Sequence, residues 1–177
     1  MIRSLIAVAM LAMPLAATAQ TCQLDFDFVT DVEHGTLAAN STLRGRVDFT
    51  VDRREHYNIE GSDTTSYYVR GAVTIKAPDG TSISGDIGVV HIIRTPYTGD
   101  YISVDGRDPV GDLGGKTIYE APMLVTVYSA PETLTNSELP KTTADWNVLG
   151  KRQVFQVHTA LNGSLHGKIS RLEAACD

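Results

Sequence analysis

The longest regular pattern of apolar and polar positions runs from Tyr67 to Ile93, on either side of Pro78-Asp79-Gly80. Pro, Asp and Gly in this order favour a three-residue turn, because Pro presets φ, Asp bonds back to the backbone and Gly adopts a left-handed conformation. Such a turn pairs apolar residues with apolar residues or glycine: Ile75 with Ile83, Val73 with Gly85, Gly71 with Ile87 and Val69 with Val89. A shift of one residue would move each set to the other face. The pattern therefore predicts a long antiparallel hairpin.

Two glycines, Gly71 and Gly85, fall among large residues on the predicted inward face of this hairpin. Glycine inside a strand marks a bend or a close approach, and strands of about a dozen residues exceed the usual length. These features predict a curled sheet. The same register predicts that His91 points inward opposite Tyr67, where the two side chains would orient a ligand. The competing interpretation is a core histidine that bonds to the tyrosine hydroxyl or to a backbone carbonyl.

Shorter alternating patterns predict further strands over 22–30, 43–52 and 155–169. Residues 117–128 are apolar on both faces, which indicates a central strand or one whose facing changes at Pro122. Residues 31–40 and 53–65 are predicted connections, and 101–104 is at most one short strand. A helical turn or two is expected from Thr143, as the cap, to Gly150. In the last hairpin, a loop of Leu161-Asn162-Gly163 would place His158 opposite His166.

These elements predict an all-β fold, because no βαβ alternation occurs anywhere in the pattern. We expect an antiparallel β-barrel or curled β-sandwich of about seven or eight strands, meander-like, with at most one short helix. The chain length of 177 residues suits one domain. Strand order beyond the two hairpins is left open by the pattern, so barrel and sandwich remain alternatives.

The first 19 residues are typical of a cleaved signal peptide. Arg3 precedes an apolar stretch over 5–15, and Ala17-Thr18-Ala19 is a small-residue cleavage site. We therefore expect a single exported domain over 20–177, in a bacterial periplasm or secreted. No later apolar run approaches the length of about 20 residues that a membrane-spanning helix needs.

The two cysteines, Cys22 and Cys176, lie near the two ends of the expected mature chain. In an oxidising compartment such a pair most simply forms one disulfide. The alternative is a reactive thiol or a metal pair, but the sequence has neither CxxC spacing nor histidines close to the cysteines. A disulfide is the prediction.

The charge and motifs exclude several classes of function. The formal net charge is −6 and the basic residues are scattered, which argues against nucleic acid as a partner. We find no GxSxG, HExxH, P-loop or dinucleotide motif.

His158 and His166 are expected to be a solvated pair rather than a metal site, with Lys168 nearby. The aspartates of residues 100–112 match no calcium-loop pattern and are expected to be solvated turns, with calcium as the alternative. No cofactor is predicted.

The sequence supports three functional hypotheses. The first is a periplasmic non-catalytic protein with a small apolar ligand inside the barrel, where Gly45, Gly71 and Gly85 make room and Tyr67 and His91 orient the ligand. The second is a cell-envelope structural or protein-interaction module with a packed core. The third is an enzyme, a hydrolase without a recognisable motif.

Overall fold

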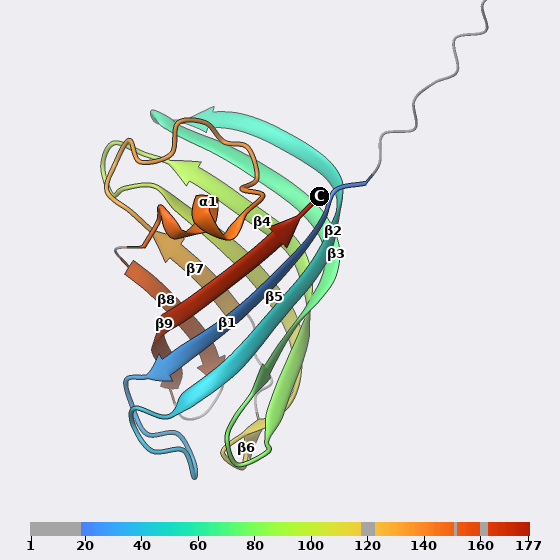
Figure 1. Ribbon diagram of the computed structural model, residues 1–177, viewed down its shortest axis with the longest axis vertical. Coiled ribbons are helices and arrows are strands. Elements are labelled where there is room, and N and C mark those ends of the chain that lie inside the picture. The colour runs from blue at the N-terminus through green and yellow to red at the C-terminus, as the bar shows by residue number, and fades with distance from the viewer. Residues whose placement is uncertain (1–18, 118–122, 151, 160–162) are drawn as a thin grey trace, which may run out of the picture.

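A computed structural model describes residues 19–117, 123–150, 152–159 and 163–177 of the chain. Within them lie nine strands and one short helix (Figure 1). The elements are β1 Thr21–Thr30, β2 Thr42–Ile59, β3 Ser62–Lys76, β4 Ser82–Arg94, β5 Tyr101–Leu113, β6 Lys116–Thr117, β7 Met123–Tyr128, α1 Thr143–Asn147, β8 Arg152–Thr159 and β9 Gly163–Cys176. The expected signal peptide, residues 1–19, lies outside the described residues except for Ala19.

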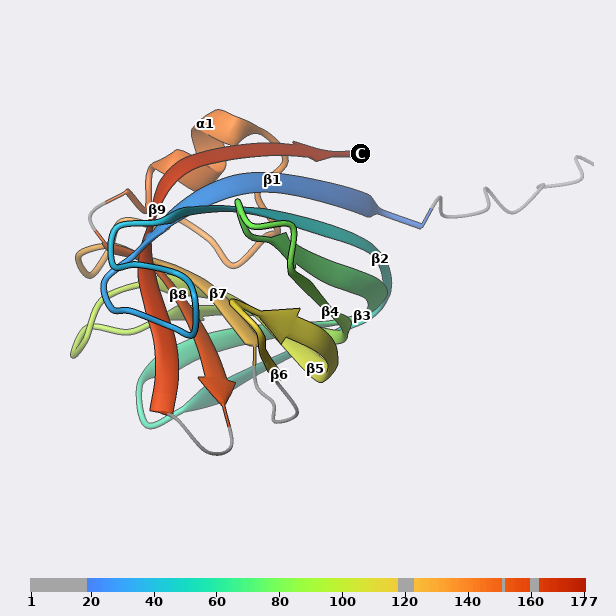
Figure 2. The ribbon, with the colours of Figure 1, turned by 90° about the horizontal axis from the view of Figure 1, so that it is seen from below.

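Eight of the strands form one curled antiparallel sheet that closes on itself. Their order is β4-β3-β2-β1-β9-β8-β7-β5, and an additional pairing of β4 with β5 completes the ring, which Figure 2 shows from below. The two-residue strand β6 pairs with the end of β5. Neighbours in the sheet are consecutive along the chain, apart from the pairing of β1 with β9 and that of β5 with β7, which β6 separates in sequence. The predicted all-β, meander-like antiparallel fold is confirmed, and this closure makes it a barrel.

The predicted turn over Pro78-Asp79-Gly80 is confirmed, with six cross-strand pairs beyond it. The pairs run from Lys76–Ser82 to Gly71–Ile87 in the expected register. The Ala77 amide donates to the Thr81 carbonyl, and Asp79 Oδ1 accepts from the Thr81 amide at 3.0 Å. Beyond Gly71 the register shifts by one residue, so that Val89 pairs with Tyr68 instead of Val69. A β-bulge of this kind bends the strand and offsets the pairing beyond it.

Three other sequence predictions are wrong in extent or register. Residues 53–59, expected to be a connection, continue β2, and the turn at Glu60-Gly61 leads directly into β3. Residues 101–112 all lie in β5, although a short strand was expected over 101–104 at most and turns over the rest. The last hairpin pairs His158 with Ser164 and Gln156 with His166, a register two residues from the expected one. A shift of two keeps every side chain on its face, which is why the apolar pattern did not exclude it. Residues 161 and 162 of the expected loop lie outside the described residues.

The core of the barrel contains buried side chains from β1, β2, β3, β4, β5, β7, β9 and the connection that carries α1. The largest fully buried members are Trp146, Phe26, Phe28, Leu24, Leu43, Ile75, Ile83, Ile92, Ile102 and Leu113. Gly45 and Gly85 serve this packing. A methyl group on Gly45 would lie 2.0 Å from Cζ of Phe26, and one on Gly85 would lie 2.5 Å from Cε of Met123. The space beside both glycines is therefore occupied by the chain itself.

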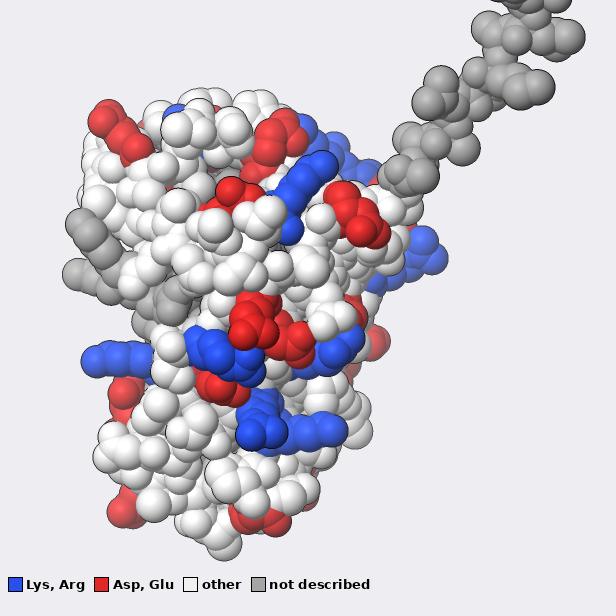
Figure 3. Space-filling model, viewed as in Figure 1, with Lys and Arg blue, Asp and Glu red and all other residues white. Residues whose placement is uncertain are grey.

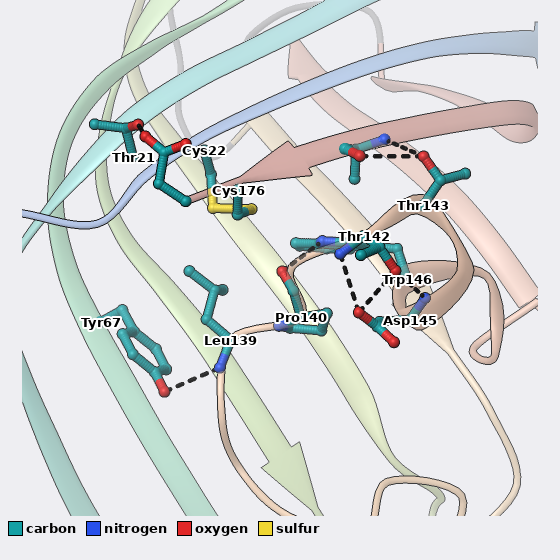
Figure 4. Close-up of a disulfide and its surroundings, with 12 residues drawn as sticks. Thr21, Cys22, Tyr67, Leu139, Pro140, Thr142, Thr143, Asp145, Trp146 and Cys176 are labelled. Carbon is teal, nitrogen blue, oxygen red and sulfur yellow. Dashed lines mark hydrogen bonds between the residues drawn. A yellow bond between two sulfur atoms is a disulfide. The ribbon is translucent and has the colours of Figure 1, made fainter.

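The connection from β7 to β8 covers one end of the barrel. Its helix α1 is capped by Thr142, whose side chain accepts from the Asp145 amide while Asp145 bonds back to the Thr142 amide. The expected short helix is confirmed, with its cap one residue earlier than predicted. Trp146 is 2% exposed and its Nε1 donates to the Pro140 carbonyl (Figure 4). The Thr143 hydroxyl donates to the carbonyl and accepts from the amide of Ala174 in β9. The connection thereby provides hydrogen-bond partners for backbone groups of β9 that lie beyond its ladder with β8.

The predicted disulfide between Cys22 and Cys176 is confirmed (Figure 4). The two residues are direct partners in the β1–β9 ladder, with their Cα atoms 4.1 Å apart. The bond therefore joins the first and last strands of the chain across their ladder. No helix among the described residues is long and apolar enough to cross a membrane.

Candidate functional site

The side chain of Tyr67 points into the barrel, as expected, and forms hydrogen bonds within the protein. It is 3% exposed, its hydroxyl donates to the Ser137 carbonyl at 3.0 Å and it accepts from the Leu139 amide at 3.1 Å (Figure 4). Burial raises the pKa of this phenol above its ordinary value. Tyr67 therefore holds the covering connection across the mouth of the barrel, and its two polar bonds are both made within the chain.

The side chain of His91 lies on the outer face, and the expected pairing with Tyr67 is wrong. His91 is the ladder partner of Ser66, while Tyr67 faces Val90. The shift in β4 between Ile87 and Val89 exchanges the faces of this strand, so that Val90 and Ile92 are buried, whereas β3 keeps its alternation and Tyr67 stays inward. The adjacent apolar residues Val89 and Val90 were the sequence signal for this change, because strict alternation places only one of two neighbours inward.

His91 instead belongs to a row of polar side chains that crosses five neighbouring strands. Nδ1 of His91 lies 2.9 Å from Oγ of Ser66, which lies 2.9 Å from the hydroxyl of Tyr57. On the other side, Nε2 of His91 lies 3.8 Å from Oδ2 of Asp105. We call the residues of this row the outer His91 cluster: Tyr57, Ser66, His91, Ser103, Asp105 and Thr126.

The far end of the cluster is a chain of hydroxyl contacts on β5 and β7. Ser103 Oγ donates to Asp105 Oδ1 at 2.7 Å and lies 3.2 Å from the Thr126 hydroxyl. Beside it, the rings of Tyr101 and Tyr128 lie 5.5 Å apart. Burial, together with the charge of nearby Asp105 and the neighbouring tyrosines, raises the pKa of Tyr101. The face is thus rich in tyrosine and hydroxyl groups.

The order Ser66, His91 and Asp105 has the residue types of a hydrolytic triad, but its geometry is unsuited to acyl transfer. Ser66 is 1% exposed and shares its hydroxyl with Tyr57. The separation of 3.8 Å between His91 and Asp105 is too long for a hydrogen bond that would orient the imidazole. Because β3 is paired on both sides, its amide groups are engaged in the sheet rather than directed at an oxyanion. The three residues therefore lack the geometry of a hydrolytic triad.

The aspartates of residues 100–112 have separate structural roles. Asp100 is 1% exposed and accepts from the amides of Thr95 and Leu134, so it joins two connections at the mouth. Asp105 belongs to the outer His91 cluster, and Asp112 accepts from the Gly115 amide in a turn. Among the described residues, no three potential ligands from His, Cys, Asp and Glu come together as a metal site.

The sequence did not identify the other members of the outer His91 cluster. Tyr57 and Asp105 lay in segments expected to be irregular, and Ser66 and Thr126 were single polar residues within strands. They become neighbours only through the strand order, which the chain pattern does not contain. No protein family, curated protein or solved structure matches this chain.

Proposed function

We propose that this chain is an exported, non-catalytic interaction module that contacts a partner protein through the outer face around His91. The observation that carries the proposal is the division between a filled interior and a polar, tyrosine-rich exterior. Phe26 and Met123 occupy the space beside Gly45 and Gly85, where a ligand was expected. The polar groups expected to orient that ligand are separated, with Tyr67 bound to the mouth connection and His91 outside.

The composition of the outer face favours a protein as the partner. Tyrosine is enriched in protein interfaces, whereas charged residues are depleted at their centres. On this face Tyr57 is 37% exposed and Ile59, two residues further along β2, is 58% exposed. The side chains of His91 and Asp105 are 28% and 26% exposed, so an approaching partner would meet apolar groups beside a His–Asp pair. The disulfide supports a location outside a reducing cytoplasm.

A photo-crosslinking amino acid at position 57 tests this proposal in the bacterium of origin. Position 110 in β5 is the matched control, because Val110 is 69% exposed and lies outside the cluster. We expect one discrete adduct from position 57 and none from position 110. Excess unlabelled protein should compete for the adduct, whereas excess Tyr57→Ser/Ile59→Ser protein should not. No adduct at position 57, or equal adducts at both positions, would contradict the proposal.

The small apolar ligand inside the barrel stays a prediction, and native mass spectrometry separates it from the proposed function. Protein purified from a periplasm would carry extra mass if a ligand were enclosed. With a filled interior we expect the mass of the disulfide-bonded chain alone. We also expect no thermal stabilisation by fatty acids or isoprenoids. Bound lipid together with such stabilisation would favour the interior ligand.

A further inference from the structure

Two cations, Arg44 and Lys76, stand directly opposite each other in the β2–β3 ladder. Both side chains are exposed on the outer face. Like charges at opposed positions of an antiparallel pair repel each other and weaken the sheet. Neither residue forms an ion pair with a carboxylate in the part of the chain that the structure describes. The carboxylate opposite Arg44 in the β1–β2 ladder, Asp27, is shared with Arg171, so it offsets the repulsion between Arg44 and Lys76 only in part.

Two further cations lie beside this pair, and carboxylates hold both of them. Arg46 contacts Asp25 and Asp48, and Arg171 contacts Asp27 and Glu173, at distances of 2.6 to 3.8 Å. These contacts restrict the two guanidinium groups before any ligand arrives, which lowers the entropy cost of binding. A hydrogen bond from Arg171, with smaller effects of the charges of Arg171 and Arg44, lowers the pKa of Asp27. Asp27 is thus charged and already paired at neutral pH.

The four cations line one open concavity of about 290 Å³. Gly45, which has no side chain, and the Thr74 side chain contribute to its wall, and Asp25 is the carboxylate in its lining. Figure 3 views this side of the barrel and shows Lys and Arg side chains gathered below a band of mixed charges. The concavity therefore combines four positive groups and a hydroxyl with one negative group that already pairs with Arg46.

We propose that this concavity, the Arg44–Lys76 site, binds an anionic group of the phosphate or sulfate class. An arginine fork donates two parallel hydrogen bonds to such an oxyanion, and a lysine supplies a point charge. The bound anion would remove the repulsion between Arg44 and Lys76. The competing explanation is a pair of solvated cations that only keeps this face soluble. That explanation predicts no anion specificity, so the two are distinguishable.

Titration of the disulfide-bonded protein with inorganic phosphate, followed by the amide NMR signals of Gly45 and Thr74, tests the site. We expect saturable shifts at both amides. Arg44→Gln and Lys76→Gln should each weaken binding at least about fivefold, because each removes a charge-assisted contact. Arg70→Gln is the control of equal charge change. The Arg70 side chain is 78% exposed and pairs with Asp52, outside the concavity. Equal phosphate affinity in all three variants and the parent would overturn the proposal.

A charge reversal at position 76 separates binding from stability. Lys76→Glu places a carboxylate opposite Arg44, so we expect a higher thermal midpoint together with loss of phosphate binding. Retained phosphate binding in this variant would contradict the site.

Vesicles of phosphatidylglycerol, with phosphatidylcholine as control, distinguish the source of the anion. Selective vesicle binding indicates a lipid headgroup, and binding of free phosphate alone indicates a soluble ligand. If the protein binds neither the vesicles nor free phosphate, the anion-site proposal is overturned. The partner-protein proposal for the outer His91 cluster would be unaffected.

Discussion

The hydroxyl of Tyr67 accepts a hydrogen bond from the backbone amide of Leu139, 72 residues later in the chain, at 3.1 Å. The same hydroxyl donates to the carbonyl of Ser137 at 3.0 Å. One side chain of β3 thereby satisfies two backbone groups of the connection that covers the barrel mouth. Leu139 itself is 3% exposed and belongs to the core, so the two residues join the cover to the barrel.

Removal of the Tyr67 hydroxyl should destabilise the fold. In Tyr67→Phe, two buried backbone groups lose their partner, and we expect a loss of about 1–3 kcal/mol in the free energy of unfolding. Tyr68→Phe is the matched control, because the Tyr68 hydroxyl donates to Glu55 at an exposed position. The control should change stability by less than about 0.5 kcal/mol. Urea denaturation measures both variants, and equal effects would contradict the role given to Tyr67.

The disulfide should contribute strongly to stability, because it closes a loop spanning 154 residues of sequence. In the chain-entropy account, a loop of this length stabilises the folded state by about 5 kcal/mol. We expect the double variant Cys22→Ala/Cys176→Ala to lose a large part of this stability in urea denaturation. The loss should equal that caused by reduction of the parent protein. A loss below about 1 kcal/mol would show that the unfolded chain gains little freedom when the bond is absent.

A side chain at Gly45 should be poorly tolerated, because the ring of Phe26 lies against this glycine. We expect Gly45→Ala to cost about 1–3 kcal/mol through overpacking, and Phe26→Leu in the same chain to recover part of that loss. Gly88→Ala is the control. A methyl group there would meet the flexible guanidinium end of Arg107 at 3.1 Å, which can move aside. Unfolding in urea compares the variants, and free tolerance of Gly45→Ala would indicate empty space beside Phe26.

His34 should make stability depend on pH. It is 4% exposed in the connection between β1 and β2, and its Nε2 has no hydrogen-bond partner among the described residues. Burial, and to a lesser degree the charge of Lys116, lowers the pKa of His34. The unfolded chain, with an ordinary histidine pKa of about 6.5, therefore binds this proton more readily than the folded chain. The contribution of neutral His34 to the free energy of unfolding is therefore fully present above about pH 6.5 and decreases as the pH falls below that value.

The variant His34→Gln tests this dependence, because glutamine does not titrate. We expect the free energy of unfolding of the parent protein to fall between pH 7.5 and about 5.5, and the variant to show a flatter profile. The other histidines remain in both proteins and cancel in the comparison. Urea denaturation at several pH values gives the two profiles. Parallel profiles would mean that His34 keeps an ordinary pKa in the folded protein.

Local turn chemistry and period-two alternation were sufficient for the strands and for one hairpin register. Pro78-Asp79-Gly80 predicted its turn correctly because the φ preferences of those residues are local. The pattern was insufficient where the two faces of a strand are not distinguished by polarity. Residues 53–59 of β2 are exposed throughout, so their sequence resembles a connection although they are paired with β3. The bulge in β4 that moved His91 to the outside changes the facing without changing the composition of the strand.

The sequence by itself determined the all-β class, the central turn with its first six cross-strand pairs, the disulfide and the inward position of Tyr67. Each depends on local conformational preference, on alternation, or on cysteine count. Only the tertiary structure decided the closure of the barrel, the face of His91 and the outer His91 cluster. It also placed Arg44 and Lys76 beside Arg171. These features depend on which strands become neighbours and where a ladder slips by one residue, and neither is encoded in the pattern of a single strand.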